Sequence, residues 1–305
     1  MKRILSFFLT VALSAALLAP GAAAVNEAVA KDTDWLYITI DPGHGGDGAG
    51  GYDPGAINST YGYQEADRVL RIGLYLKQEL ETYRHVHVDM TRSDRDGTYY
   101  TAPLSKVQRR VDFAQQKGSD LLVSLHLNGA ATQSAHGALI LASNGNYDPA
   151  CASVVDGVGT NILAQLGKLG LDTSRGLVKE SSHDGTTYPN GKLADYYGIV
   201  RYGQLAHIPS MIIEHCFISS DSDSAQFLSS DAKLRISRWR MRAASRRITA
   251  LRRKRRARPT PSRPSATAAS TGRGNMLTPP QPPAGWPASA TGSSPRTTHS
   301  RAVCS

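Results

Sequence analysis

Four ionisable side chains in this sequence have the types and positions expected of a hydrolytic metal site. His44 lies in the segment DPGHGG, His126 lies in SLHLN, and Glu214 ends the apolar run MIIE. Glu65 follows the glycine-rich stretch after His44. Two imidazoles and one carboxylate form a ligand set that zinc accepts, and a catalytic zinc site leaves its fourth position to water.

Hydrolysis of an amide at such a site needs one further carboxylate that does not bind the metal. Zinc lowers the pKa of its water toward ~7 and polarises the scissile carbonyl. The free carboxylate takes the proton from that water and passes it to the leaving amine. The four side chains therefore match the needs of a zinc hydrolase, provided that the fold brings them together.

The ends of the predicted strands are the places where these side chains can come together. Alternation and apolar runs predict strands over 35–41, 86–90, 120–128 and 210–214. In the third of these, one face is entirely apolar and the other ends in Ser-x-His-x-Asn. Ligands of open α/β sheets lie beyond the carboxyl ends of the strands. We therefore expect the groups that follow or end these strands to meet at one edge of the sheet.

Helical periodicity separates the strands. Apolar residues at steps of three and four predict a helix from Glu65 to about Tyr83, another from Pro103 to Gly118, and a third within 151–171. Strands alternating with helices predict a single α/β domain, with a mostly parallel twisted sheet flanked by helices.

Several of these residues also have a purely structural interpretation. His44 alone suits a turn, and Glu65 alone suits the first turn of a helix, where the helix dipole favours an acid. His126 and Glu214 interrupt apolar strands and need partners if they are buried. Asp41 is either a carboxylate that orients His44 or a turn-forming residue.

Taken in order, the motifs resemble those of the zinc-dependent N-acetylmuramoyl-L-alanine amidases of the amidase-3 type. The resemblance runs from Trp35 to Leu228, and its segments are DPGHGG (41–46), PGA (54–56), Glu65, Thr91-Arg92, Arg110, SLHLN (124–128) and IEHCFIS (213–219). One departure is His215, where many relatives have an apolar or small residue.

The resemblance implies His44, Glu65 and His126 as Zn²⁺ ligands and Glu214 as the catalytic acid/base. It implies hydrolysis of the amide between N-acetylmuramic acid and L-alanine in peptidoglycan. Asn128 is expected to contact the substrate, and Arg92 and Arg110 are expected to be structural. Two alternatives stay open: a zinc- and peptidoglycan-binding module of the same fold without turnover, and a zinc peptidase that cuts within the stem peptide.

The two ends of the chain differ from the middle. Residues 1–24 have the basic start, short apolar run and small-residue cleavage site of a secretory signal, which predicts a secreted or wall-associated protein without stable membrane insertion. Residues 31–231 are expected to form the catalytic domain as a monomer. Residues 232–305 carry 17 of the 35 Lys and Arg residues and none of the 25 Asp and Glu residues.

That composition predicts a disordered, low-complexity tail. The first 231 residues carry a net charge of −7, so the basic whole-chain charge does not indicate a nucleic-acid-binding fold. Codons for 237–251 exist for which a neighbouring reading frame spells LAMADARGIAAYYGL. A frameshift origin of the tail is therefore a hypothesis that the gene sequence tests, and it implies a domain without its usual last helix.

Overall fold

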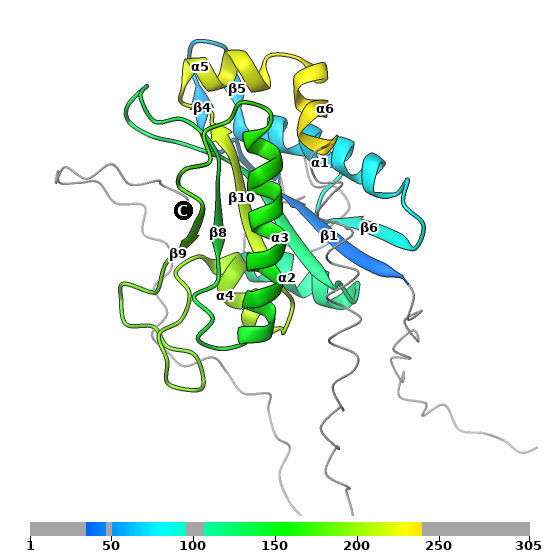
Figure 1. The fold of residues 1–305 in the computed structure, drawn as a ribbon, viewed down its shortest axis with the longest axis vertical. Helices are drawn as coiled ribbons and strands as arrows, with labels where there is room; N and C mark the ends of the chain where they lie inside the picture. Colours follow the sequence, from blue (N-terminus) through cyan, green and yellow to red (C-terminus); the bar gives the residue numbers. More distant parts are fainter. Residues whose placement is uncertain (1–34, 47–50, 96–106, 240–305) are drawn as a thin grey trace, which may run out of the picture. The chain divides into compact units, whose positions relative to one another are not determined.

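A six-stranded sheet forms the centre of the computed structural model, which describes residues 35–46, 51–95 and 107–239. The strand order is β6-β1-β7-β10-β8-β9 (Figure 1). The four parallel strands are β6 (Val86–Met90), β1 (Leu36–Pro42), β7 (Leu121–Asn128) and β10 (Ser210–Phe217). Strand β8 (Leu139–Ala142) is antiparallel to β10, and β9 (Leu177–Lys179) is parallel to β8. The predicted α/β class with a mostly parallel sheet is confirmed.

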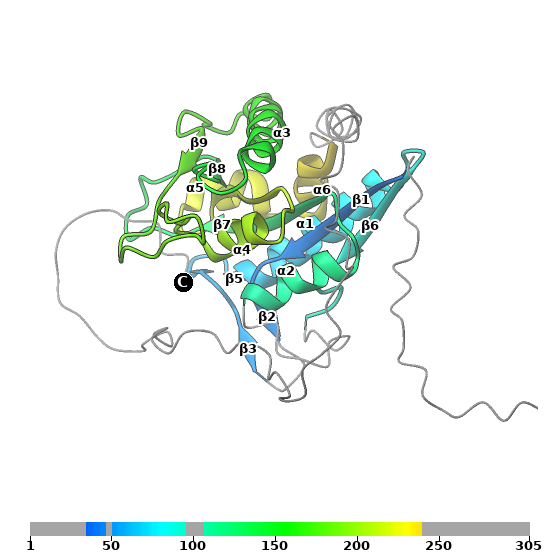
Figure 2. The same ribbon diagram turned by 90° about the horizontal axis from the view of Figure 1, so that it is seen from below.

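Helices cover both faces of this sheet. One apolar cluster joins α1 (Glu65–Leu80) and α3 (Pro149–Gly167) to one face. A second, smaller cluster joins α2 (Val107–Gln116) and α4 (Gly198–Leu205) to the other face. Figure 2 shows α3 and α2 on opposite sides of the strands.

The side-chain alternation of β7 explains why the sheet has two covered faces. Its odd-numbered leucines and Val123 belong to the larger cluster, whereas Leu122 belongs to the smaller one. Ser124 and His126 follow Leu122 at intervals of two and therefore project from the same face, toward the side of α2 and α4. The predicted division of this strand into an apolar face and a polar end is present.

Two short hairpins lie between β1 and α1, where the sequence predicts only a loop. They pair β2 (Gly45–Gly46) with β3 (Tyr52–Asp53) and β4 (Ile57–Asn58) with β5 (Tyr63–Gln64). Helix α1 begins directly after β5, and no side chain caps it. Instead, the backbone N–H groups of Glu65 and Ala66 donate to the carbonyls of Ala56 and Pro54. This backbone cap fixes Glu65 at the edge of the sheet.

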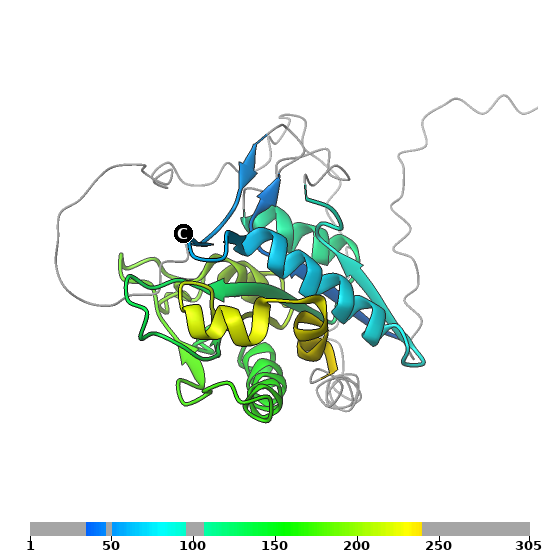
Figure 3. The ribbon, with the colours of Figure 1, turned by 90° about the horizontal axis from the view of Figure 1, so that it is seen from above.

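Several further elements were not predicted. Besides β8, β9 and α4, these are α5 (Asp221–Asp223), the π-helical turn η1 (Ser224–Leu228) and α6 (Asp231–Trp239). Helix α6 runs beside α1, as Figure 3 shows, and buries Leu234 completely. Helical structure thus continues to Trp239, beyond Asp231, where the catalytic domain is expected to end.

Some predicted features fall outside the described residues. These are the signal segment 1–24, the start of the second predicted helix at Pro103, and the tail beyond Trp239. Among the described helices, none combines the length and the apolar character needed to cross a bilayer. The sequence leaves open whether Cys151 and Cys216 form a disulfide. In the structure both are buried and are not joined to each other.

Truncation of a buried core side chain should destabilise the fold. Leu125 is completely buried in the larger cluster, so Leu125→Ala removes packing that the surroundings cannot refill. We expect the free energy of unfolding to fall by about 2–5 kcal/mol, measured by urea denaturation. Leu205→Ala, at a side chain 37% exposed, is the matched control. Equal losses for the two variants would contradict this description of the core.

Candidate metal centre

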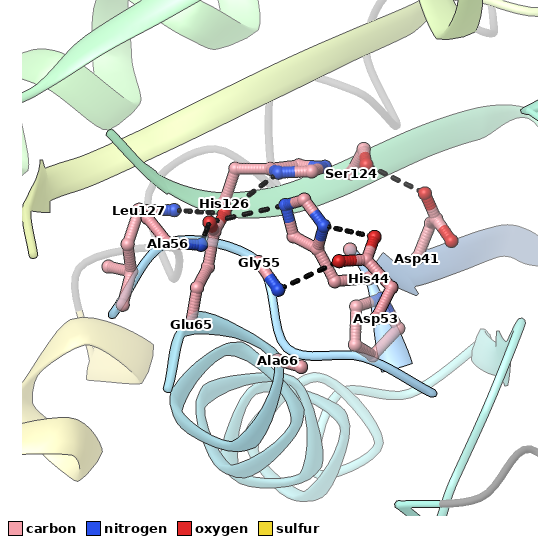
Figure 4. A network of polar contacts seen from close by, with 12 residues as sticks. Asp41, His44, Asp53, Gly55, Ala56, Glu65, Ala66, Ser124, His126 and Leu127 are labelled. Carbon is pink, nitrogen blue, oxygen red and sulfur yellow. Dashed lines mark hydrogen bonds and ion pairs between the residues drawn. The ribbon is translucent and has the colours of Figure 1, made fainter. Parts of the chain in front are cut away.

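Three side chains from three separate segments meet at the carboxyl edge of the parallel strands. His44 follows β1, His126 lies near the end of β7, and Glu65 begins α1 (Figure 4). His44 Nε2 lies 3.2 Å from Glu65 Oε2, and His126 Nδ1 lies 2.9 Å from Glu65 Oε1. One ligand atom from each residue lies within 4.8 Å of the other two. The structure thus brings together the three residues expected to bind metal.

Glycine makes this close approach sterically possible. A Cβ at Gly43 would lie 2.3 Å from Cε1 of His126. A Cβ at Gly55, where φ is +65°, would lie 2.7 Å from both the Glu65 carboxylate and the His44 ring. The glycines of this segment therefore leave the space that the cluster occupies.

The Glu65 carboxylate is the acceptor at the centre of the cluster. Besides the two imidazoles, it accepts hydrogen bonds from the backbone N–H groups of Ala56 (2.9 Å) and Leu127 (3.0 Å). Burial alone would raise the pKa of Glu65, but the hydrogen bonds and charges of His126 and His44 outweigh burial and hold the pKa well below its usual range. Glu65 is therefore a carboxylate at neutral pH.

Asp53 orients His44, and the sequence did not reveal it. Oδ2 of Asp53 lies 2.7 Å from His44 Nδ1, while its Oδ1 accepts the N–H of Gly55 at 2.9 Å. Burial opposes the charged imidazole, but Asp53 and Glu65 outweigh burial and raise the pKa of His44 to about 9. The alternative in which Asp41 orients His44 is wrong, because the Asp41 carboxylate has other partners.

Asp41 is instead the buried centre of a second polar network. It accepts hydrogen bonds from Arg110 Nη1 (2.7 Å), Ser124 Oγ (2.6 Å) and Thr91 Oγ1. Burial raises the pKa of the Asp41 carboxyl, but Arg110 and the two hydroxyl groups outweigh burial and lower it. Arg110 also donates to the carbonyl of His44 at 3.0 Å, so the network supports the backbone of the cluster.

Arg92 also hydrogen-bonds to the backbone that leads to His44. It is 1% exposed, and it donates to the carbonyls of Pro42 (2.9 Å), Gly43 (2.6 Å) and Ala66 (2.8 Å). Burial lowers the pKa of Arg92 to about 10, which leaves the guanidinium charged at neutral pH. Arg92 thus ties the segment before His44 to the first turn of α1. The expectation that Arg92 and Arg110 are structural agrees with these contacts.

Glu214 lies on the strand beside His126. The two residues are paired in the parallel ladder of β7 and β10, so their side chains project from the same face. Glu214 is buried, as is its neighbour His215, and burial lowers the pKa of His215 to about 4. The imidazole of His215 is therefore uncharged at neutral pH.

A cavity of about 330 Å³ opens beside the two histidines. Its walls include His44, His126, Tyr52, Asp53, Val107 and Ile199. This volume lies at the lower end of the range for small-molecule sites. Glu214 is not among the lining residues, and neither is Asn128. Asn128 is fully buried, and neither polar atom of its side chain has a hydrogen-bond partner among the described residues.

Comparison with known proteins identifies the family of this chain. The fold and the cluster define an α/β protein with a candidate metal centre at the carboxyl edge of its sheet. The amidase-3 family, described as N-acetylmuramoyl-L-alanine amidase, matches residues 38–243. The chain therefore belongs to the amidase-3 family.

Individual relatives agree with this assignment. The chain is 36% identical over 101 residues to a putative N-acetylmuramoyl-L-alanine amidase of Buchnera aphidicola, which covers 33% of this chain and 38% of that protein. It is 34% identical over 107 residues to N-acetylmuramoyl-L-alanine amidase AmiC of Escherichia coli, covering 35% and 22%. The matches thus span well under half the length of these relatives.

The fold also matches a solved structure. An N-acetylmuramoyl-L-alanine amidase from Clostridium difficile 630 superposes with a TM-score of 0.55 at 20% identity, covering 70% of this chain and 96% of that one. At this identity the likeness concerns the fold alone.

The Asp41 network predicts a pH-dependent stability effect. Asp41→Asn leaves Arg110 buried without its carboxylate, so we expect the free energy of unfolding at pH 7 to fall by about 3–5 kcal/mol. A carboxyl whose pKa is lowered in the folded chain stabilises it above the ordinary carboxyl pKa of about 4, and this stabilisation is lost as the pH falls. The difference in the free energy of unfolding between Asp41→Asn and the wild type should therefore become smaller below about pH 4.

The control is Asp231→Asn, which removes the ion pair of Asp231 with Arg71. Both side chains of that pair are about half-exposed, and exposed pairs contribute little. Denaturation curves of the two variants from pH 3 to pH 7 make the comparison. If Asp41→Asn lowers the free energy of unfolding no more than Asp231→Asn does, the structural role of the Asp41 network is contradicted.

Proposed function

We propose that this chain is a zinc-dependent amidase that hydrolyses the bond between N-acetylmuramic acid and L-alanine in peptidoglycan. The observation that carries the proposal is the convergence of His44, Glu65 and His126, whose ligand atoms lie within 4.8 Å of one another. Membership of the amidase-3 family supports the same activity. We further propose that the protein acts as a secreted or wall-associated monomer.

The donor set fits a zinc ion. Two ligands of a tetrahedral zinc with bonds of about 2.0–2.1 Å lie about 3.3 Å apart. The distance of 3.2 Å from His44 Nε2 to Glu65 Oε2 is close to that value. Asp53 accepts from the other nitrogen of His44, as carboxylates behind metal-binding histidines commonly do. We therefore propose His44, Glu65 and His126 as the ligands.

The chemistry divides between the ion and Glu214. When bound, zinc supplies polarisation of the scissile carbonyl and a lowered pKa for water. Glu214 is proposed to accept the proton of the attacking water and to return it to the amine of L-alanine as the amide C–N bond breaks. Its place beside His126 on the neighbouring strand supports this role. The products are the free lactyl carboxylic acid and the free peptide amine.

Glu214→Gln tests the proposed function. We expect the variant to retain zinc but to lose at least about 100-fold in kcat, because glutamine cannot transfer the proton. Mass spectrometry of a muropeptide digest identifies the bond that is cut. The matched control is Glu81→Gln, at an exposed side chain at the end of α1. Retained activity, or cleavage within the stem peptide, would contradict the proposal.

Asp53→Asn tests the orientation of His44. The side-chain amide of asparagine can occupy the space of the Asp53 carboxylate, but it does not supply a negative charge beside Nδ1 of His44. We expect zinc affinity to fall by about 10- to 100-fold, measured by competition with a chelator. Asp172→Asn, in an exposed loop, should leave affinity unchanged. Unchanged affinity in Asp53→Asn would show that the carboxylate does not support metal binding.

We also propose that Asn128 takes part in substrate binding. Its side-chain amide projects from the same face of β7 as His126 and lacks a partner in the described chain, and burying such a group is costly unless a ligand or water pairs with it. Asn128→Ala should raise KM for a soluble muropeptide by about 5- to 30-fold, the effect of one lost hydrogen bond. An unchanged KM in a normally folded variant would exclude Asn128 as a substrate contact.

A further inference from the structure

The β4–β5 hairpin, residues 57–64, begins and ends at the candidate metal centre. Ala56, directly before it, donates its N–H to the Glu65 carboxylate and accepts the N–H of Glu65 with its carbonyl. Glu65 follows directly after β5. Both ends of the hairpin therefore adjoin Glu65.

The hairpin exposes apolar and aromatic surface. Ile57 is 53% exposed and Tyr61 is 40% exposed, and both are among the few large hydrophobic side chains that the described chain leaves at its surface. The Tyr61 ring stacks on the Tyr63 ring with centroids 5.3 Å apart and planes 19° apart. The Arg68 guanidinium lies 3.7 Å from the centre of the Tyr63 ring. The stack presents a preformed aromatic surface beside the centre.

Buried polar contacts hold this surface in place. The Asn58 side chain, 2% exposed, donates to the carbonyl of Ile218 (2.8 Å) and to the carboxylate of Asp221 (2.9 Å). Its oxygen accepts the backbone N–H of Tyr61 at 2.9 Å. The Thr60 hydroxyl donates to the same aspartate at 3.0 Å. The hairpin is thus fixed to the segment that follows β10, so Tyr61 needs little ordering when it binds a ligand.

The cavity and the hairpin differ in what they can hold. No residue of the hairpin lines the 330 Å³ cavity, whose walls include the two histidines and residues of β1, β2, β3, α2 and α4. The substrate of the proposed function has a short peptide on one side of the scissile amide and a long sugar strand on the other. A short branch can enter a cavity, whereas a strand that continues in both directions needs an open surface.

We propose that the β4–β5 hairpin binds the glycan strand of the substrate, with the apolar face of an N-acetylated sugar ring packed on Tyr61 and Ile57. This inference rests on the proposed function for the identity of the strand. Aromatic rings bind through their apolar faces with little loss of side-chain freedom. Exposed apolar patches next to a site are typical of ligand-binding surfaces.

Binding of peptide-free glycan strands tests the proposal. Such strands contain no scissile amide, so calorimetric titration of the full wild-type chain measures binding without turnover. We expect Tyr61→Ala and Ile57→Ala each to raise Kd by about three- to tenfold, and Tyr61→Phe to keep the wild-type Kd. Both alanine variants change exposed side chains, and thermal melts confirm that they fold.

The matched control is Tyr196→Ala, at a tyrosine 45% exposed outside the hairpin, which should keep the wild-type Kd. An unchanged Kd in both Tyr61→Ala and Ile57→Ala overturns the proposal. It is also overturned if these variants weaken binding of a free stem peptide and leave strand binding intact. Because no arm depends on hydrolysis, failure here is distinct from failure of the Glu214→Gln test.

Discussion

The Glu65 carboxylate is the contact on which the candidate centre depends. It is buried and charged. It contacts two imidazoles and accepts hydrogen bonds from two backbone N–H groups, and these four partners come from three different segments. A buried carboxylate with fewer partners would be costly. The position of α1 at the sheet edge, the bend after β1 and the end of β7 are therefore mutually constrained. A bound metal ion would replace the direct contacts of the Glu65 carboxylate with the imidazoles of His44 and His126.

The surrounding framework holds the backbone rather than the ligands themselves. Arg92 and Arg110 donate to carbonyls in the turn that leads to His44, and Asp41 balances the charge of Arg110. His44 itself has a positive φ of 56°, which is uncommon for a residue with a side chain. Two buried guanidinium groups provide enough hydrogen bonds to maintain such a turn. These contacts give Arg92 and Arg110 a structural role in the turn that positions His44.

The sequence predicts the parts of the fold that local patterns encode. The alternation within β7 places His126 correctly, and the periodicity of α1 places Glu65 at its start. Asp53 was missed because its segment of the sequence has no periodicity, and its place near His44 depends on the pairing of the two-residue strands β2 and β3. The strands β8 and β9 were missed because they are short, with four and three residues. Helix α6 was missed because its composition is strongly basic, and its packing on α1 outweighs that signal.

His44, Glu65 and His126 are proposed to bind one metal ion together. X-ray absorption spectroscopy of the zinc-loaded chain identifies the atoms that bind this ion. We expect two imidazole nitrogens and carboxylate or water oxygens at about 2.0–2.2 Å, with one nitrogen lost in His126→Ala. A spectrum with sulfur ligands, or one that His126→Ala leaves unchanged, would contradict this proposal.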